Sequence, residues 1–189
     1  MEDKELIRRI QNGQKEYLNE IAARYYDDIY YFCAYQTGDR EAAYDLAQET
    51  FLRFIRYVDR YRYRNLKGYL LTIAMNVCRT YFHEAGVRRV EQEFREELIH
   101  TADMDECECL PGSENAGSIK RMESSQVLSD ALLQLPSAQR EAVLLHHFYG
   151  YKNREIARMT GASFAAVKSR INQGLGKLKN LLDREDFYE

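Results

Sequence analysis

The sequence predicts an all-α protein in which two small helical domains are joined by a flexible acidic linker. Apolar residues recur at helical spacing through most of the 189 residues, and no segment alternates as a half-buried strand does. Only two prolines and ten glycines are present to interrupt helices. The apolar period fails between residues 87 and 121, where acidic residues dominate. We therefore expect domains at 1–86 and 122–183, with the linker at 87–121 between them.

Four helices are expected in the first domain. Their predicted ranges are 3–11, 15–36, 40–58 and 68–84. Thr37-Gly38 should end the second helix, and Asp39 can cap the third with its carboxylate. The third helix carries a predicted buried stripe that consists of Leu46, Ala47, Phe51, Phe54, Ile55 and Val58.

The second domain is predicted to begin with helices at 122–134 and 138–148. Val127 belongs to the expected inner face of the first of them, and Ser137 can cap the second with its hydroxyl. Asn153 is the expected cap of the short helix that follows. This domain is therefore also predicted to be helical throughout.

Residues 153–178 have the pattern of a helix-turn-helix. A short helix ends at Gly161, which can adopt the left-handed conformation, and Ser163 can cap the longer helix that follows. The predicted buried stripe of the longer helix, at intervals of four, four and three, is Val167, Ile171, Leu175 and Leu178. Its expected outward side chains are Phe164, Lys168, Ser169, Arg170, Asn172 and Gln173.

Such an outward face can read DNA. Lys and Arg can hold phosphates, while Arg, Asn and Gln can hydrogen-bond the edges of bases. The alternative is an ordinary corner between two helices with a solvated face. The residue types favour DNA reading over that alternative.

The charge distribution suits nucleic-acid binding better than the total charge does. The net charge is −3, but residues 1–90 carry 15 Lys and Arg against 13 acidic residues, and residues 119–189 carry 11 against 8. Residues 91–118 carry one Arg and nine acidic residues. An acidic connector therefore masks two mildly basic ends.

A second candidate surface lies between Arg53 and Tyr69, where basic and aromatic side chains interleave. The basic residues are Arg53, Arg56, Arg60, Arg62, Arg64 and Lys67, and the aromatic ones are Tyr57, Tyr61, Tyr63 and Tyr69. Basic groups that follow a backbone, with aromatic faces on which bases stack, are what single-stranded nucleic acid needs. The alternative is that the tyrosines belong to a core and the arginines to its solvated fringe.

A third candidate surface is the polar side of the predicted helix 40–58, opposite its buried stripe. Its residues are Asp45, Gln48, Glu49, Leu52 and Arg53. Such a face can dock a helix of another protein or can simply be solvated. The spacing alone favours the solvated interpretation.

Composition argues against several other classes of protein. Charges occur within the first five residues, and no apolar run approaches the roughly 18 residues of a membrane helix, so we expect a cytoplasmic protein without membrane insertion. No catalytic set or phosphate-binding loop indicates an enzyme, and we expect no cofactor or metal. Cys33 and Cys78 fall on apolar stripes. Cys107 and Cys109 form a C-x-C in the linker, a spacing that is unusual for zinc or redox sites.

Two sets of motifs resemble the extracytoplasmic-function (ECF) sigma factors of RNA polymerase. T-G-D-R-E-A-A at 37–43 followed by D-L-A-Q-E-T-F-L-R-F at 45–54 resembles region 2 of that family. L-P-S-A-Q-R-E-A-V at 135–143, followed by R-E-I-A at 154–157 and V-K-S-R at 167–170, resembles region 4. The resemblance covers about 1–85 and 122–182 in the family's order, and it leaves out only the linker.

The resemblance implies three sets of contacts. Docking of region 2 on the coiled coil of the largest polymerase subunit maps to Asp45, Gln48, Glu49, Leu52 and Arg53. Melting and reading of the −10 element on the non-template strand map to Arg56, Tyr57, Arg60, Tyr61, Arg62, Tyr63, Arg64, Lys67, Tyr69, Asn76 and Arg79. Reading of the −35 duplex in the major groove maps to Arg154, Ser163, Phe164, Ala165, Lys168, Ser169, Arg170, Asn172 and Gln173.

The resemblance therefore implies a non-enzymatic factor that gives RNA polymerase its promoter specificity. The implied partners are core RNA polymerase, through the coiled coil and the flap, promoter DNA, and an anti-sigma factor. The linker corresponds to the segment that threads the polymerase exit channel. Two other hypotheses are a stand-alone helix-turn-helix repressor or activator, and a redox or metal protein that uses Cys107 and Cys109.

Overall fold

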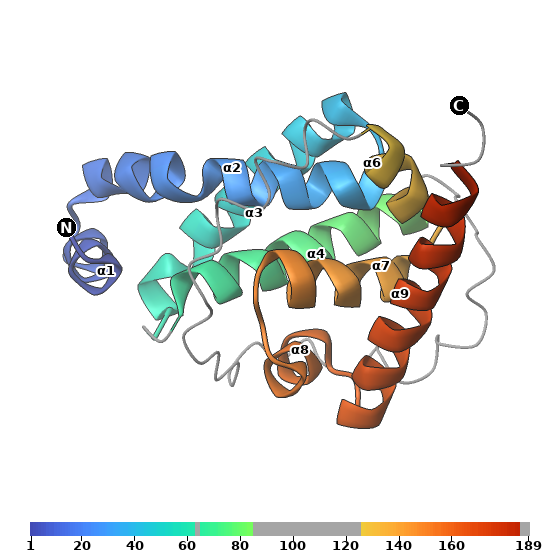
Figure 1. Ribbon diagram of the computed structural model, residues 1–189. Helices are drawn as coiled ribbons and strands as arrows, with labels where there is room; N and C mark the ends of the chain where they lie inside the picture. Colours follow the sequence, from blue (N-terminus) through green and yellow to red (C-terminus); the bar gives the residue numbers. More distant parts are fainter. Residues whose placement is uncertain (63–64, 85–125, 186–189) are drawn as a thin grey trace.

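We describe residues 1–62, 65–84 and 126–185 of the computed structural model (Figure 1). The N-terminal helices are α1 (Asp3–Gln11), α2 (Leu18–Thr37), α3 (Arg40–Tyr57) and α4 (Leu66–Glu84). The C-terminal helices are α6 (Gln126–Leu133), α7 (Ser137–Val143), α8 (Asn153–Thr160) and α9 (Phe164–Glu185). These described residues contain no strand, which confirms the all-α prediction. The predicted linker at 87–121 lies outside them.

Helices α2, α3 and α4 form the N-terminal core, because each of them buries one apolar stripe against the other two. Phe32, Phe54 and Leu70 are fully enclosed there. Cys33 and Cys78 are also buried, as their positions on apolar stripes predict, and their sulfur atoms lie 3.8 Å apart. Both thiols therefore belong to the packing of α2 against α4.

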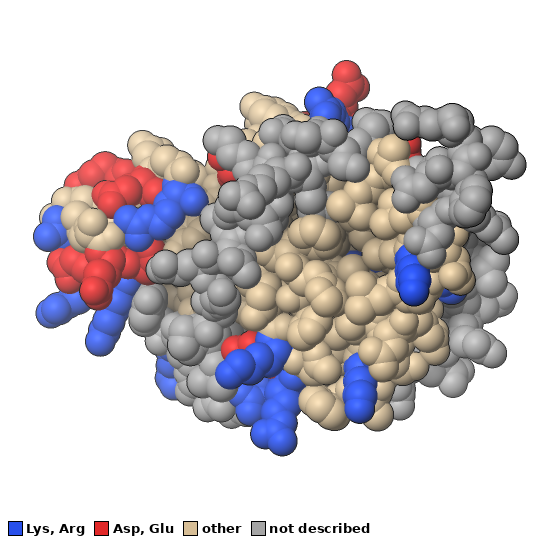
Figure 2. All heavy atoms as spheres, viewed as in Figure 1, with Lys and Arg blue, Asp and Glu red and all other residues tan. Residues whose placement is uncertain are grey.

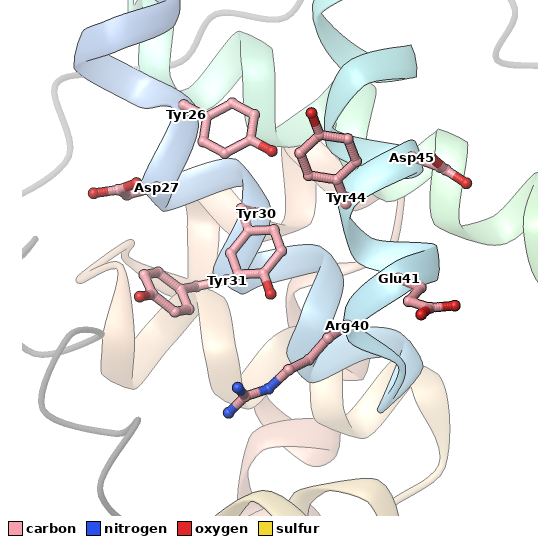
Figure 3. A pocket seen from close by; sticks show the side chains of 8 residues that line it. All are labelled: Tyr26, Asp27, Tyr30, Tyr31, Arg40, Glu41, Tyr44 and Asp45. Carbon is pink, nitrogen blue, oxygen red and sulfur yellow. The ribbon is translucent and has the colours of Figure 1, made fainter.

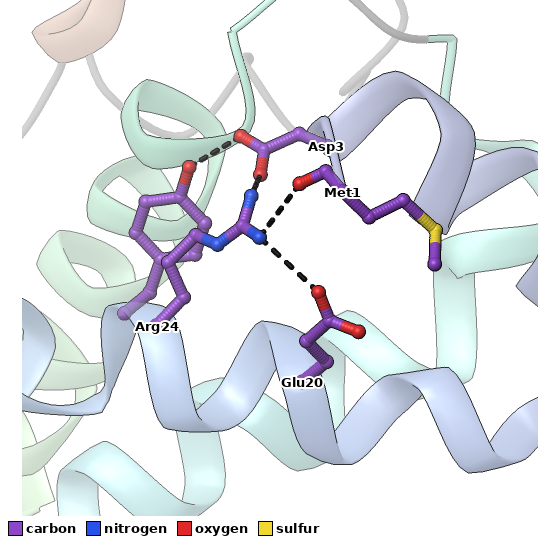
Figure 4. A network of polar contacts seen from close by, with 5 residues as sticks. Met1, Asp3, Glu20 and Arg24 are labelled. Carbon is purple, nitrogen blue, oxygen red and sulfur yellow. Dashed lines mark hydrogen bonds and ion pairs between the residues drawn. The ribbon is translucent and has the colours of Figure 1, made fainter.

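Helix α1 packs near the start of α2 and is fixed there by a polar network (Figure 4). Asp3 accepts hydrogen bonds from the Arg24 guanidinium and the Tyr25 hydroxyl, and Arg24 also pairs with Glu20 at 3.3 Å. At the other end of α1 the Gln11 amide donates to two carbonyl oxygens of the chain after α3, at 2.9 and 2.8 Å. Helix α1 buries an apolar face, and these polar contacts determine the orientation of the helix.

The predicted turn signals before α3 and before α9 are confirmed. Gly38 ends α2 at φ 73°, and Asp39 Oδ1 accepts hydrogen bonds from two backbone N–H groups in the first turn of α3, at 2.9 and 3.1 Å. Gly161 ends α8 at φ 70°, and Ser163 Oγ accepts one from the first turn of α9 at 3.2 Å. The helix-turn-helix is therefore formed by α8 and α9.

Three apolar residues that the sequence pattern places in the core are exposed: Ile55 (41%), Val127 (46%) and Leu175 (38%). The buried stripe of α9 contains Val167, Ile171, Gly174 and Leu178 instead. Leu175 falls beside this stripe because α7 crosses α9 at Gly174, where an added Cβ atom would lie 2.7 Å from Val143 Cγ2. Ile55 and Val127 likewise lie beside the buried stripes of α3 and α6.

Two predicted caps are wrong. Ser137 is the first residue of α7, and Pro136 occupies the cap position before it. Asn153 is the first residue of α8, and the residue before it, Lys152, donates its backbone N–H to Glu155 Oε2 at 2.6 Å. The Glu155 carboxylate therefore accepts from the backbone N–H at the cap position, as the glutamate of a capping box does.

A π-helical turn follows α7 at Leu144–Phe148, so the predicted helix 138–148 is divided into two parts. The backbone N–H of Tyr149 donates to the carbonyl of Leu144 at 3.2 Å, which closes this wider turn. Beyond it, Tyr149 and Tyr151 are both buried.

The N-terminal and C-terminal helices pack directly on each other, a contact that the sequence pattern does not predict. Helices α6 and α7 lie against α2, and α8 lies against α4 (Figure 1). At this seam the Tyr149 hydroxyl donates to the backbone carbonyl of Asp28 at 2.6 Å, and its ring meets the edge of Phe32 at 5.9 Å between centroids. The buried Arg140 guanidinium donates to the carbonyl of Gln36 at 2.5 Å.

These polar contacts make the seam specific. Burial raises the pKa of the Tyr149 hydroxyl well above its ordinary value, so the hydroxyl remains a donor wherever the protein is folded. A buried hydroxyl or guanidinium without an acceptor costs free energy, and here the acceptors are carbonyl oxygens on α2. The two groups of helices therefore fit in one relative position.

Substitution of two glycines on α9 tests the crossing with α7. Gly174→Ala should lower the free energy of unfolding by about 1–3 kcal/mol, because the new methyl group overlaps Val143 in a packed core. Gly176→Ala is the matched control: nothing lies within 4 Å of its Cβ position, so better helix propensity should raise the free energy of unfolding by up to about 1 kcal/mol. Urea unfolding followed by circular dichroism measures both. Stabilisation by both substitutions would contradict the crossing.

Candidate protein-binding and nucleic-acid-binding surfaces

The outer side of α3 carries the five residues of the predicted docking set. Asp45, Gln48 and Leu52 are exposed, and the Leu52 side chain is 59% accessible. Glu49 and Arg53 are half-buried and pair with each other at 2.7 Å. The structure therefore brings all five residues to one side of one helix, with Asp45, Gln48 and Leu52 fully available to a partner.

Two further residues belong to this side of α3 and were missed. Ile55 continues the exposed stripe, because Asp45, Gln48, Leu52 and Ile55 follow one another at intervals of three, four and three. Tyr44 is 51% exposed beside Asp45. The helical spacing from Asp45 could have placed Ile55 on this side of α3. The apolar side chain of Ile55 made a core position the simpler prediction. We call the stripe of Asp45, Gln48, Leu52 and Ile55 the α3 face.

A shallow groove of about 530 Å³ lies between α2 and α3 next to the α3 face (Figure 3). The rings of Tyr26, Tyr30 and Tyr44 turn toward it, and Tyr26 and Tyr30 stack with their centroids 6.2 Å apart. Asp27 and Asp45 point outward on its two sides. The groove therefore extends the α3 face with aromatic surface and acidic edges.

The basic and aromatic surface follows the end of α3. Arg56, Arg60 and Arg62 are exposed, whereas Tyr63 and Arg64 lie outside the described residues. Tyr57 is also exposed. These side chains can reach a nucleic-acid backbone without any rearrangement of the core.

Tyr61 and Tyr69, two tyrosines of this predicted surface, form an aromatic pair. Their ring centroids lie 4.7 Å apart, and Tyr69 meets the edge of buried Phe54 at 6.3 Å. Burial raises the pKa of the Tyr69 hydroxyl. The sequence left open whether these tyrosines belong to a core or stack on bases. Tyr69 is the more enclosed, as a core residue would be, and Tyr57 is the more open, as a stacking residue would be.

Helix α4 carries the remaining members of the predicted −10 set. Asn76 is exposed, but Lys67 and Arg79 already have partners. Lys67 Nζ pairs with Asp28 at 2.9 Å and lies 5.5 Å from the centre of the Tyr149 ring. Arg79 pairs with Glu141 of α7 at 2.8 Å. Both cations therefore lie at the seam between the N-terminal and C-terminal helices.

The helix-turn-helix presents the start of α9 to solvent. The exposed residues of this part are Ser163, Phe164, Ala165, Lys168, Ser169, Asn172 and Gln173. Arg154 is exposed at the start of α8. Arg170 is half-buried. The Gln173 amide is held by two hydrogen bonds, from Gln139 of α7 at 2.8 Å and to Ser169 at 3.0 Å. Lys168 and Asn172 are therefore more open to base edges than Gln173 is.

Charged groups are distributed unevenly over one face of the molecule. On the face shown in Figure 2 an uncharged area lies at the centre, and separate Lys and Arg side chains stand along its lower margin.

Among the residues that the structure describes, no group of three or more His, Cys, Asp or Glu is placed to hold a metal. Cys107 and Cys109 lie outside those residues. In the described part of the chain, no helix has the length and apolar character needed to cross a bilayer.

Comparison with known proteins matches the two halves separately. Residues 21–87 match the family described as Sigma-70 region 2, and residues 125–178 match Sigma-70, region 4. These matches include α2 from Ile21 onward, α3 and α4 in the first half, and α6 to α9 up to Leu178 in the second.

Curated relatives extend the match over most of the chain. The ECF RNA polymerase sigma factor EcfG of Rhodopseudomonas palustris is 31% identical over 155 residues, which cover 80% of this chain and 78% of EcfG. The ECF RNA polymerase sigma factor BldN of Streptomyces coelicolor is 29% identical over 180 residues. That match covers 94% of this chain and 65% of BldN, so the chain spans about two thirds of the BldN length.

A solved structure shares the fold. The sigma factor RpoE from Bartonella quintana, crystallised in complex with the anti-sigma factor NepR, superposes with a TM-score of 0.64. The superposition covers 87% of this chain and 96% of RpoE, at 22% sequence identity. At that identity the likeness concerns the arrangement of the helices.

Proposed function

The chain belongs to the ECF RNA polymerase sigma factors, and we propose that it binds core RNA polymerase and directs transcription initiation at specific promoters. The observation that carries this proposal is the presence of both sigma regions in one chain, in the family's order. Region 4 alone would suit any helix-turn-helix regulator. Region 2 adds a surface for polymerase and one for an opened strand.

In the proposed mechanism the α3 face docks on the coiled coil of the largest polymerase subunit. A docking surface needs apolar area that becomes buried and polar groups that set the register. Leu52 and Ile55 supply the apolar area, and Asp45 and Gln48 supply the polar groups. The C-terminal helices would meet the flap, and the chain would act in the cytoplasm, where polymerase and DNA are.

Promoter opening is assigned to the basic and aromatic surface after α3. A site drives melting only if it binds an unstacked strand better than it binds duplex. Tyr57 and Tyr61 offer faces worth about 1–3 kcal/mol to each stacked base, and Arg56, Arg60 and Arg62 offer charges to the phosphates. Two such stacking contacts of about 1.4 kcal/mol each would shift the open fraction roughly a hundredfold.

Upstream recognition is assigned to the start of α9 in the major groove of the −35 element. Lys168, Ser169 and Asn172 lie on its exposed side, and Phe164 can contact a thymine methyl group. We further infer an anti-sigma partner for this chain, as for RpoE, whose solved complex contains NepR. Such a partner would cover docking and DNA surfaces together.

The docking assignment predicts a loss of polymerase affinity without a loss of stability. Leu52→Ala combined with Asp45→Ala should weaken binding to core enzyme about tenfold or more, because a central interface side chain contributes more than about 1 kcal/mol. Val127→Ala, another exposed apolar residue, is the control and should bind normally. Fluorescence titration with labelled chain measures the affinity, and thermal unfolding checks the fold. An unchanged affinity of the double variant would reject the α3 face.

The melting assignment predicts a defect that depends on the state of the promoter. Arg62→Ala should reduce run-off transcription from a duplex promoter, because one phosphate contact to the opened strand is lost, and a pre-melted −10 bubble should restore it. Arg8→Ala removes another exposed arginine, on α1, and should have no effect. Full duplex activity of Arg62→Ala at raised salt would contradict the assignment.

The upstream assignment predicts an effect on sequence preference. Lys168→Ala should cost roughly 1–3 kcal/mol and relax the preference at one −35 position if the side chain bonds a base, or weaken all promoters alike if it bonds a phosphate. Lys177→Ala, farther along α9, serves as the matched control. A substitution scan of the −35 element with each variant holoenzyme separates these results. Tight binding of promoter duplex by the chain without polymerase would instead favour a stand-alone helix-turn-helix regulator.

A further inference from the structure

Three polar side chains form a short series of hydrogen bonds between α7 and the start of α9. Gln139 Nε2 donates to Gln173 Oε1 at 2.8 Å, and Gln173 Nε2 donates to Ser169 Oγ at 3.0 Å. Gln173 and Ser169 belong to the set that is proposed to read the −35 element, whereas Gln139 belongs to none of the candidate sets. Both bonds run in one direction, from α7 toward Ser169. We call these three residues the Gln–Gln–Ser network.

The direction of these bonds decides what the Ser169 hydroxyl can offer to DNA. A serine hydroxyl has one O–H donor and two acceptor lone pairs, and Gln173 occupies one of the lone pairs. Helical hydroxyls often spend the O–H on the carbonyl four residues before, as Thr50, Thr72, Thr80 and Thr160 do. Within the described part of the chain Ser169 makes no such bond. Ser169 therefore presents an unused donor on the exposed side of α9.

The packing of α7 on α9 holds Gln139 in place beside Gln173. Gly174 is buried, and a Cβ atom added there would lie 3.5 Å from the carbonyl oxygen of Gln139 and 3.6 Å from its Cβ atom. The absence of a side chain at Gly174 therefore lets α7 come close enough for the Gln139 amide to reach Gln173.

The environment of Gln139 also favours one orientation of its amide. Gln139 Oε1 is enclosed, and among the described residues no group donates a hydrogen bond to it. The opposite orientation would enclose the NH₂ group instead, and buried N–H groups without an acceptor are rarer in proteins than under-satisfied carbonyl oxygens. The amide therefore keeps its donor toward Gln173, and the direction of the whole network follows from it.

We propose that Gln139 is a positioning residue for −35 recognition, because through Gln173 it makes the Ser169 hydroxyl a hydrogen-bond donor to one base in the major groove. This inference rests on the proposed function for the role of α9. On their major-groove edges guanine and thymine offer acceptors, cytosine offers a donor, and adenine offers both. A donating hydroxyl therefore selects guanine or thymine over cytosine at the position that Ser169 meets.

The network turns an otherwise adaptable hydroxyl into a selective one. A serine alone suits either kind of base edge, because its O–H can turn away and leave a lone pair for the base. In this network the Gln173 oxygen that could receive the O–H of Ser169 already faces Gln139. A cytosine amino group at this position would then meet a donor, and water is excluded where the helix enters the groove, so the mismatch costs free energy.

Two substitutions should reverse the direction of the network. Gln139→Glu replaces the donor with a carboxylate that only accepts, so Gln173 must turn its NH₂ group toward α7 and its oxygen toward the Ser169 O–H. Gln173→Glu places a carboxylate between Gln139 and Ser169, where it accepts from both of them. In either variant Ser169 has only lone pairs left for the base.

Both variants should therefore exchange the preference at the same base position. The unmodified chain should favour guanine or thymine over cytosine there by about fivefold or more, and each variant should favour cytosine over guanine and thymine by a similar factor. Adenine should be accepted by all three. A residue that only stabilised α9 would change affinity or weaken the preference, but it would not reverse it.

Four further variants isolate this effect. Ser169→Ala should abolish the preference at one position and so identifies that position. Gln139→Leu removes the donor without adding an acceptor, and it should weaken the preference without reversing it. Gln134→Glu after α6 and Asn180→Asp on α9 add a negative charge at other exposed sites, and both should keep the preference of the unmodified chain.

The measurement uses the full chain assembled with core RNA polymerase and a library of promoter duplexes randomised through the −35 and −10 elements. Bound duplexes are sequenced, and the enrichment of each base is compared at each position between the unmodified chain and the variants. Circular dichroism of each variant checks the fold. Gln173 is exposed, so Gln173→Glu keeps the test decisive if Gln139→Glu does not fold.

Several results would overturn the inference. A preference for cytosine at the position that Ser169→Ala identifies, or no position that responds to Ser169→Ala, would show that Ser169 does not donate to a base. Reversal by Gln173→Glu but not by a folded Gln139→Glu would show that Gln139 does not set the direction. Selection of a promoter sequence that neither carboxylate variant changes would reject the inference and leave the proposed function standing. If the unmodified holoenzyme enriches no sequence at all, the proposed function fails, and the inference fails with it.

Discussion

The buried side chain of Tyr149 is the contact on which the arrangement of the two groups of helices depends. Its hydroxyl is too deep to reach water, so it requires an acceptor from the protein, and the nearest one is a backbone carbonyl of α2. Apolar surface alone would allow the C-terminal helices to slide over α2 and α4. The hydrogen bond of Tyr149, with that of Arg140, selects one position among those.

In this position the candidate functional residues differ in their accessibility. The residues proposed to meet the polymerase lie on the exposed side of α3, and α9, which is proposed to read DNA, presents its start to solvent. Lys67 and Arg79 lie where the two halves meet.

Much of the fold could be predicted from residues whose effect is local. Gly38, Asp39, Gly161 and Ser163 determine their turns through their own backbone conformation or hydrogen bonds, and the structure places them as the sequence predicts. The failures involve neighbours that are distant in the sequence. Leu175 loses its place in the core because α7 approaches α9 at Gly174, and no pattern within α9 announces that crossing.

The candidate surfaces, too, could be predicted where the signal is local but not where it depends on residues distant in the sequence. The five residues predicted to dock share one helix, so helical spacing and family resemblance were enough to group them. Ile55 was misplaced because an apolar side chain at a helical interval fits either a core or a docking face, and only the packing of α2 and α4 decides. Tyr149 beside Lys67 and Glu141 beside Arg79 each lie more than 60 residues further along the chain than the cation, beyond the reach of any local pattern.

The π-helical turn at Leu144–Phe148 determines how the residues before it and after it are rotated relative to each other about the helix axis. Glu141 before the turn and Tyr149 after it both face the N-terminal helices. Eight residues of uninterrupted α-helix would leave these two side chains about 80° apart around the axis. The wider turn takes up most of that rotation, so both side chains reach the same neighbour. The one extra residue that the turn accommodates thus corrects the rotation between the two side chains. The number of residues in this segment is therefore as constrained as their types.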